Sequence, residues 1–183
     1  MKPIYSLLAG VIVLGLAGCN ILPQAQVDVV RYFTLSSAAN SPAQTEGTTV
    51  RPVQLAGHLR NRAMAVRVAE NEVIYLEDVR WAESLSDAVT LMLRAKLGPL
   101  GGNSVVSVEV QRCELLRHEG NAVQVAATYT ILTLGENSLP KRGVFSSSPR
   151  AWDGTDHGTL VNLLRDSVSE LGDAIAAALP EKK

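Results

Sequence analysis

Apolar and polar residues alternate with a period of two along much of the chain, a pattern that predicts β-strands with one buried and one solvated face. The clearest case is Val106–Gln111, in which three valines alternate with polar residues. Beyond Arg112 the apolar positions shift to the other parity, at Cys113 and Leu115. Because a change of parity turns the apolar side chains to the opposite face, we expect a β-bulge or the end of pairing near this point.

Six more runs rich in β-branched and apolar residues predict the remaining strands. They are Val27–Leu35, Val50–Leu55, Met64–Val68, Val73–Glu77, Val123–Ile131 and Arg142–Ser147. Two polar segments, Ala69–Glu72 and His118–Asn121, separate neighbouring runs and predict antiparallel hairpins. Pro52 has no N–H to donate, so its strand is expected at an edge of the sheet or at a bulge.

The period changes to about 3.6 in two segments, which predicts helices over Ala82–Leu97 and Asp153–Leu179. Ser84 is a capping signal near the start of the first helix, and Asp153 or Thr155 is expected to cap the second. Strands interrupted by one helix and closed by another are typical of two packed layers. We therefore predict an α+β fold, with a mostly antiparallel sheet and both helices packed on one face.

A tryptophan stands directly before each predicted helix, Trp81 before the first and Trp152 before the second. Such a residue either packs against the core where the helix begins or stays exposed for recognition. Packing against the core is the interpretation that we favour for both.

A short apolar segment precedes the predicted domain. Lys2 is followed by the apolar stretch Ile4–Leu16, which is too short for a membrane span of roughly 20 residues, and the motif Leu16-Ala17-Gly18-Cys19 closes it. Small residues directly before a cysteine are typical of bacterial lipoprotein processing. We predict a signal peptide over residues 1–18, a covalent lipid on Cys19 with palmitate among its acyl chains, a tether over 19–28 and one domain over 29–180.

The lipid on Cys19 would hold the chain to a membrane, because each buried methylene contributes roughly 0.8 kcal/mol. A tether of this length extends about 30 Å at roughly 3.3–3.6 Å per residue, so the domain is expected to work close to its bilayer. Asn20 follows the modified cysteine. It resembles the residues that permit sorting to the outer membrane in enteric-type bacteria, so we expect the periplasmic face of that membrane.

Charge and cysteine content exclude some classes of function. The chain carries 17 Lys and Arg residues against 18 Asp and Glu residues, so its balanced charge gives no sign of nucleic-acid binding. Once Cys19 is lipidated, Cys113 has no partner for an intramolecular disulfide, and we expect a small buried apolar residue.

Few residues of the sequence suggest a metal site or a catalytic site. His58 and His118 are isolated, without a second ligand at metal-binding spacing. Asp153, Asp156 and His157 fall within one turn and could bind a cation or act as acid and base, but acidic residues at the start of a helix also serve as caps. We favour the capping interpretation, and we predict that the protein is no enzyme and holds no cofactor or metal beyond its covalent lipid.

Basic residues gather in one stretch: Arg51, His58, Arg60, Arg62 and Arg67. Such a group could bind an acidic partner protein or anionic headgroups, or it could form a solvated loop that happens to be basic. We keep Arg51, Arg60, Arg62 and Arg67 as candidate partner-binding residues.

The order of these features resembles the ABC-type transport auxiliary lipoprotein family, over essentially the whole chain. The matching segments are the motif ending at Cys19, Arg31–Leu35, Val50–Val53 leading to Leu59, Glu72–Tyr75, Trp81–Leu85 and Trp152–Gly154 at the start of the last helix. The resemblance rests on their order and spacing, since each motif alone is short.

The resemblance implies an accessory subunit of an Mce-type ABC system that moves phospholipids between the two membranes and maintains the envelope. Its partner would be an Mce-domain protein, and assembly into an oligomer stays open. Two alternatives also stay open: a stand-alone lipoprotein that stabilises an outer-membrane complex, and a degenerate hydrolase.

Replacing Cys19 by Ala removes the sulfur atom that accepts the diacylglycerol. We expect this variant to remain a soluble or signal-anchored precursor that takes up no radioactive fatty acid. Labelling of the growing cells measures this, and equal label in the wild type and the variant would contradict the predicted lipid anchor.

Overall fold

The computed structural model describes residues 29–35, 47–100, 102–135 and 139–180. The predicted signal peptide, Cys19 and the tether lie outside these residues. In chain order, the elements are β1 (Arg31–Phe33), β2 (Thr49–Val50), β3 (Gln54–Leu55), the 3-10 helix η1 (Gly57–Arg60), β4 (Ala63–Ala69), β5 (Glu72–Trp81), α2 (Leu85–Leu97), the 3-10 helix η2 (Gly98–Leu100), β6 (Ser104–Leu116), β7 (Ala122–Thr133), β8 (Lys141–Ser146), β9 (Arg150–Ala151) and α3 (His157–Ala178).

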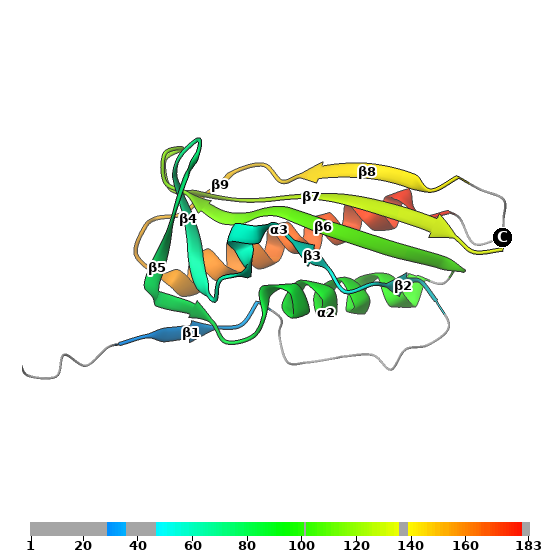
Figure 1. Ribbon diagram of the computed structural model, residues 1–183, viewed down its shortest axis with the longest axis horizontal. Helices are drawn as coiled ribbons and strands as arrows, with labels where there is room; N and C mark the ends of the chain where they lie inside the picture. The colour runs from blue at the N-terminus through cyan, green and yellow to red at the C-terminus, as the bar shows by residue number, and fades with distance from the viewer. Residues whose placement is uncertain (1–28, 36–46, 101, 136–138, 181–183) are drawn as a thin grey trace, which may run out of the picture.

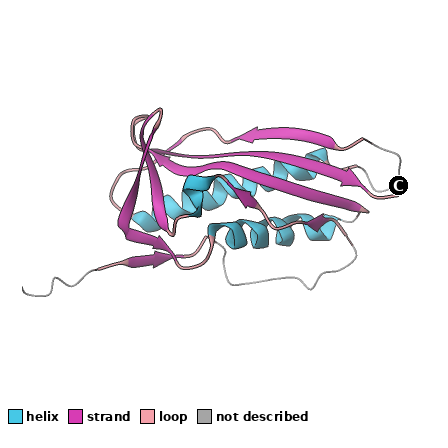
Figure 2. Cartoon of the chain, viewed as in Figure 1, coloured by secondary structure: helices cyan, strands magenta, loops and turns pink. Residues whose placement is uncertain are grey.

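Within the described residues, the strands form one sheet of nine strands, with the main order β1-β5-β4-β6-β7-β8. β2 and β3 pair with β6, and β9 pairs with β7. Helices α2 and α3 lie side by side on one face of the sheet (Figures 1 and 2). The α+β class and the placement of both helices on one face are therefore confirmed.

The sheet is mixed, and its long pairings are antiparallel, so the expectation of a mostly antiparallel sheet is confirmed. The long pairs β4–β5, β6–β7 and β7–β8 are antiparallel, whereas β1 is parallel to β5, and β2, β3 and β4 are parallel to β6. Between β4 and β6 the chain passes through β5 and helix α2. A connection of this length returns the chain in its original direction, so the next strand is parallel.

The expected bulge is present in β6. The pairing of β6 with β7 shifts register between Val110 and Arg112 and then continues to Leu116. Val110 and Cys113 are both buried in the core shared with the helices, so the bulge lets the apolar positions stay on the same face after the change of parity.

Several predicted boundaries were wrong. The run Val50–Leu55 is divided into β2 and β3, with Pro52 between them, and it lies along the edge of β6. Of the predicted strand Val27–Leu35, β1 contains three residues, while residues 27 and 28 lie outside the described part. α2 begins at Leu85 and α3 at His157, each later than expected, and β9 was not predicted.

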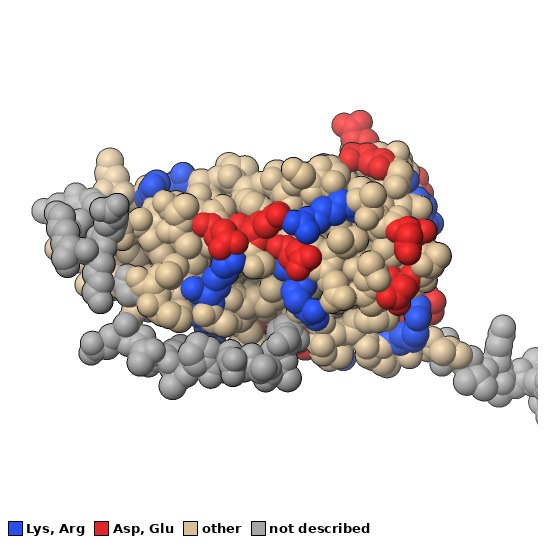
Figure 3. Space-filling model, turned by 180° about the vertical axis from the view of Figure 1, so that it is seen from behind, with Lys and Arg blue, Asp and Glu red and all other residues tan. Residues whose placement is uncertain are grey.

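Acidic and basic side chains are mixed on the face of the molecule seen in Figure 3. Ion pairs join neighbouring elements, such as Lys96 of α2 with Asp173 of α3 at 2.7 Å, and Arg150 of β9 with Glu170 of α3. This mixed surface agrees with the balanced composition. In the described part of the chain, neither helix combines the length and apolar character that crossing a bilayer requires.

Val108 and Glu109 test the side-chain register of β6, because Val108 is 3 % exposed and its neighbour faces solvent. Val108→Asp places a carboxylate in the core and should cost several kcal/mol out of a total of roughly 5–15, enough to unfold much of the protein. Glu109→Ala should be mild. Thermal melts compare the two, and a larger loss for Glu109→Ala would contradict the register.

Candidate functional site

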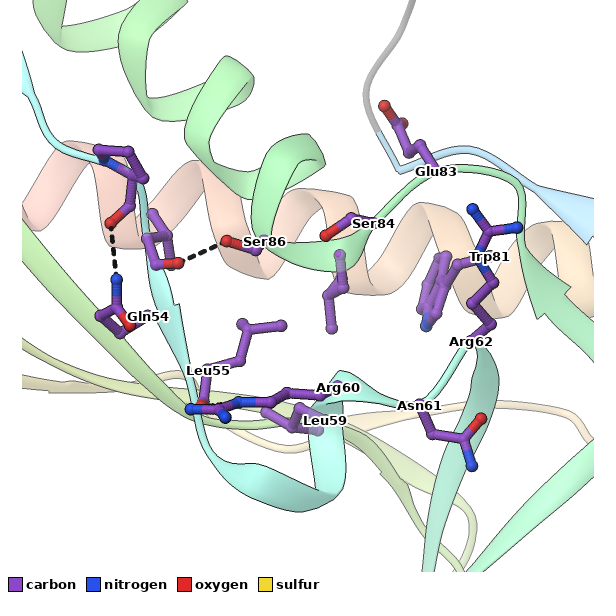
Figure 4. Close-up of a pocket in the computed structure, with 13 residues that line it drawn as sticks. Gln54, Leu55, Leu59, Arg60, Asn61, Arg62, Trp81, Glu83, Ser84 and Ser86 are labelled. Atoms are coloured by element: carbon purple, nitrogen blue, oxygen red, sulfur yellow. Dashed lines mark hydrogen bonds between the residues drawn. The ribbon is translucent and has the colours of Figure 1, made fainter.

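A cavity of about 400 Å³ lies between the β3–η1 segment and the first turn of α2 (Figure 4). Its lining comes from three stretches of the chain that are separate in sequence. The lining residues are Pro52, Val53, Gln54, Leu55, Leu59, Arg60, Asn61, Arg62, Trp81, Glu83, Ser84, Leu85 and Ser86.

Side chains of α2 hold the backbone of the β2–β3 segment in place. The Val53 N–H donates to the Thr90 hydroxyl at 2.9 Å, and the Ser86 hydroxyl donates to the Val53 carbonyl. The Arg94 Nε donates to the carbonyl of Val50 at 3.1 Å. These bonds satisfy backbone groups on the side of the segment that β6 does not pair, and they fix the two walls of the cavity relative to each other.

Part of the cavity lining is apolar. Leu55, Leu59, Trp81 and Leu85 are all buried and belong to the main hydrophobic core. The space between them is therefore bounded by residues whose packing also stabilises the fold. Such walls favour an occupant that brings some apolar surface of its own.

Two arginines are among the polar residues that line the cavity. Arg60 and Arg62 are exposed, with Arg60 beside Leu55 and Leu59 and Arg62 beside Trp81 (Figure 4). The Arg60 Nε donates to the Leu55 carbonyl at 3.3 Å, while the Arg62 side chain has no hydrogen bond or ion pair within the described part of the chain. Glu83 is the one carboxylate among the described lining residues. The lining thus has an excess of positive charge.

Ser84 adds a further donor. It occupies the N-cap position of α2, but its side chain makes no capping hydrogen bond. The first N–H groups of a helix lack partners within the helix and carry part of the positive end of its dipole. Ser84, Leu85 and Ser86 all line the cavity, so this end of α2 adds to the positive potential there.

The basic stretch predicted from the sequence does not form one surface. Arg60 and Arg62 line the cavity, and Arg51 is exposed outside the lining. Arg67 and His58 instead contact Glu114: the Arg67 Nε donates to one carboxylate oxygen at 2.6 Å, and the His58 Nε2 lies 3.2 Å from the other. The stretch therefore divides into exposed residues and residues that contact a buried carboxylate.

Glu114 is fully buried, and it is not among the residues that the sequence predicted to have a role. It follows the bulge in β6, and Arg67 reaches it from β4 while His58 reaches it from η1. Burial of an ionised carboxylate is costly unless it is paired and hydrogen-bonded, and these contacts provide both. The sequence does contain a signal for this buried charge: Glu114 is the only charged residue in the segment Cys113–Leu116, which is otherwise apolar.

Cys113 is buried and free, as expected. Burial raises the pKa of its thiol to about 12, and the adjacent negative charge of Glu114 is the second cause. Since the nucleophilic form of cysteine is the thiolate, this side chain stays protonated and unreactive at neutral pH.

The two acidic residues before α3 accept hydrogen bonds from backbone N–H groups two or three residues further along the chain. Asp156 is the N-cap, where the expectation was Asp153 or Thr155, and its carboxylate accepts hydrogen bonds from the N–H groups of Gly158 at 3.1 Å and Thr159 at 2.9 Å. These bonds lower the pKa of Asp156. The Asp153 carboxylate accepts from the Thr155 N–H, which lowers its pKa as well.

His157 is the first residue of α3 and contacts β1. The Arg31 guanidinium is 2.5 Å from its Nδ1, and its ring centroid lies 5.3 Å from that of Trp152 and 6.4 Å from that of Phe33. Trp152 is buried and donates from its indole nitrogen to the Asp156 carbonyl. Both tryptophans pack into the core, as expected, and Trp81 in addition forms a wall of the cavity.

Residues 33–176, which include every residue of the cavity lining, match the family of ABC-type transport auxiliary lipoprotein components. The chain belongs to this family. Membership makes the protein an auxiliary lipoprotein component of an ABC-type transport system, and it points to a role without catalysis. The resemblance seen in the sequence is thereby confirmed.

Solved structures share this fold at low sequence identity. An uncharacterized protein is 15 % identical with a TM-score of 0.65, covering 83 % of this chain and 99 % of its own. A Xanthomonas campestris protein of the DUF330 family is 13 % identical with a TM-score of 0.60, and the match covers 80 % of this chain and 90 % of that protein. Among curated proteins, none matches the sequence.

Arg67 and Arg62 should differ sharply in their effect on stability. Arg67→Leu removes the closest partner of the buried Glu114 and leaves it with His58 and with Arg112, whose Nε lies 4.0 Å away. The change should cost about 3–5 kcal/mol, because the buried charge loses its main compensation. Arg62→Leu removes an exposed side chain and should change stability by no more than about 0.5 kcal/mol. Urea unfolding of both variants measures this, and equal losses would contradict the division of the basic stretch.

Proposed function

We propose that this protein is the accessory subunit of an Mce-type ABC system that transports phospholipids between the inner and outer membranes. The observation that carries the proposal is the family match over residues 33–176, which spans nearly the whole described domain. An inner-membrane permease and ATPase would supply the energy, and an Mce-domain protein would cross the periplasm. The accessory subunit would receive that protein at the outer membrane and so help to maintain the envelope.

The predicted lipid anchor sets where this subunit works. The motif ending at Cys19 and the residue Asn20 support attachment to the periplasmic face of the outer membrane. With a tether of about 30 Å at full extension, the domain would stay close to that membrane. A subunit in this place can guide the end of a bridging protein without itself undergoing chemistry.

The surface that we propose for the partner is the exposed part of the basic stretch: Arg51, Arg60 and Arg62. Arginine is favoured at interfaces because its planar guanidinium makes paired hydrogen bonds and its stem covers apolar surface. Arg67, the fourth candidate, contacts Glu114 and would act indirectly by fixing β4 beside β6.

Reversal of both cavity arginines, Arg60→Glu with Arg62→Glu, should weaken co-purification of the Mce-domain protein from cross-linked membranes. Opposite charges on partner surfaces attract, so the reversal turns attraction into repulsion. The effect should be larger at low than at moderate salt, since screening shortens the reach of exposed charges to about 8 Å at physiological ionic strength.

The matched control is Arg117→Glu with Arg142→Glu, which makes the same change in net charge at two exposed positions outside the cavity. Both double variants should melt within a few degrees of the wild type. If folded Arg60/Arg62 protein recovered as much partner as the control, the proposed surface would be wrong. If the wild type recovered no Mce-domain protein, the transporter role itself would fail, in favour of the stand-alone envelope lipoprotein.

A further inference from the structure

One face of the sheet is left uncovered by the helices, since α2 and α3 both pack on the opposite face (Figures 1 and 2). Side chains of residues paired across neighbouring strands point to the same face. Glu109, Thr128 and Val144 form one such row on the uncovered side, where Val144 is 79 % exposed. The next row along the strands consists of Ser107, Thr130 and Arg142. We call the uncovered side of β6, β7 and β8 the open face.

The centre of the open face carries no charge. The central strand, β7, contains no charged residue between Ala122 and Thr133. Depletion of charged residues distinguishes the centre of a protein interface from the rest of a protein surface. On the helix side of the sheet, by contrast, ion pairs such as Lys96 with Asp173 lie at the surface. The open face therefore has the composition of an interface centre.

The charges of the open face lie at its two margins and have opposite signs. Glu109 is on β6 at one margin, and Arg142 is on β8 at the other. Both residues are exposed, and neither side chain makes a hydrogen bond or ion pair within the described part of the chain. Arg112, further along β6, is instead held by the Gln124 side-chain oxygen at 3.1 Å. A surface with a free acid on one margin and a free base on the other is complementary to a rotated copy of itself.

Contacts on the helix side fix β8 in place. A Cβ atom at Gly143 would collide with the ring of Tyr129, so only glycine lets this ring lie against β8. The Lys141 Nζ donates to the Ala178 carbonyl at the end of α3 at 3.0 Å. Both contacts hold β8 in its register with β7, which keeps Arg142 on the open face.

We propose that the open face binds a second copy of this chain, in a two-fold dimer whose sheets stack with the axis along β7. Stacked sheets pack about 10 Å apart with their strands nearly aligned. Half a turn about β7 lays β6 of each copy over β8 of the other, so that Glu109 of one copy meets Arg142 of the other at both margins. Glu109 is level with Val144, and Arg142 is the next residue of β8 on this side, about 7 Å along the strand, which its long side chain can span.

The size of the contact predicts a reversible dimer. The nine residues Gln124–Leu132 extend about 31 Å, and three strands spaced about 4.8 Å apart give about 430 Å² for each copy. Two copies would then bury about 860 Å², an area typical of weak and transient complexes. We therefore expect dimers in exchange with single copies.

Charge reversal tests the contact. The full chain is co-expressed in two versions with different C-terminal affinity tags, the cells are lysed in a neutral detergent, one tag is captured and recovery of the other is measured. Wild-type copies should recover each other. Glu109→Arg in both copies, or Arg142→Glu in both, should lower this recovery at least about tenfold, because like charges then face each other at both margins.

A mixed pair of variants tests which residues meet. With Glu109→Arg in one copy and Arg142→Glu in the other, both margins again join opposite charges, so recovery should return close to the wild-type level. Arg117→Glu in both copies is the matched control, because it reverses an exposed charge beyond the end of β6 and should leave recovery unchanged. All of these variants should melt within a few degrees of the wild type.

Cysteine cross-linking tests the orientation of the two copies. Side chains of β7 on the open face lie near the two-fold axis and face their own counterparts, so a short bismaleimide should join Thr128→Cys into a covalent dimer. Asp87→Cys, at an exposed position of α2 on the other side of the sheet, should be joined far less. The wild type gives the background, because Cys113 is buried.

Three results would overturn the proposal. No recovery between wild-type copies would exclude the dimer. Unchanged recovery with folded Glu109→Arg or Arg142→Glu, or no gain in the mixed pair, would exclude the contact between these two residues. Cross-linking of Asp87→Cys as readily as Thr128→Cys would place any association on another face.

The inference goes beyond the proposed transport role and rests on the residues of the open face alone. Arg117→Glu with Arg142→Glu should lose self-association and still recover the Mce-domain protein, because both positions lie outside the cavity. Self-association of the wild type without any recovery of that protein would leave the dimer intact and contradict the transport role.

Discussion

Pairing along both edges of β6 is the constraint on which the rest of the fold depends. One edge is paired with β7 over almost its whole length. The other edge is shared in turn by β2, β3 and β4, which follow one another along it in the same direction. Because β2, β3 and β4 all pair with β6, the register of β6 determines where the loops between these three strands lie.

The cavity is a consequence of this shared edge. Between β3 and β4 the chain leaves β6 to form η1, and the hydrogen bonds from α2 hold β2–β3 from the opposite side. The departure of the chain leaves a space that Leu59 and Trp81 border but do not fill. Because core residues bound this cavity, its shape is as stable as the core itself.

Local patterns predicted local structure well. The change of parity after Arg112 indicated the bulge, and the alternation of Val106–Gln111 indicated which side chains are buried. The parallel pairing of β2 and β3 with β6 was not predictable from these patterns, since it depends on where α2 returns the chain. For the same reason, the sequence showed that arginines gather near Arg60 without showing that Arg67 faces a carboxylate 47 positions away.

The burial of Glu114 has a consequence for how relatives of this protein can diverge. His58 and Arg67 come from two different elements, and both contact the same carboxylate. A single inherited change of Arg67 removes the closest partner of the buried carboxylate, and a change of Glu114 leaves Arg67 and His58 without theirs. An apolar residue at 114 together with apolar replacements for its partners restores a packed interior. We therefore expect the three positions to change together across lineages, so that η1, which also carries Leu59 and Arg60 of the cavity, evolves in step with the end of β6.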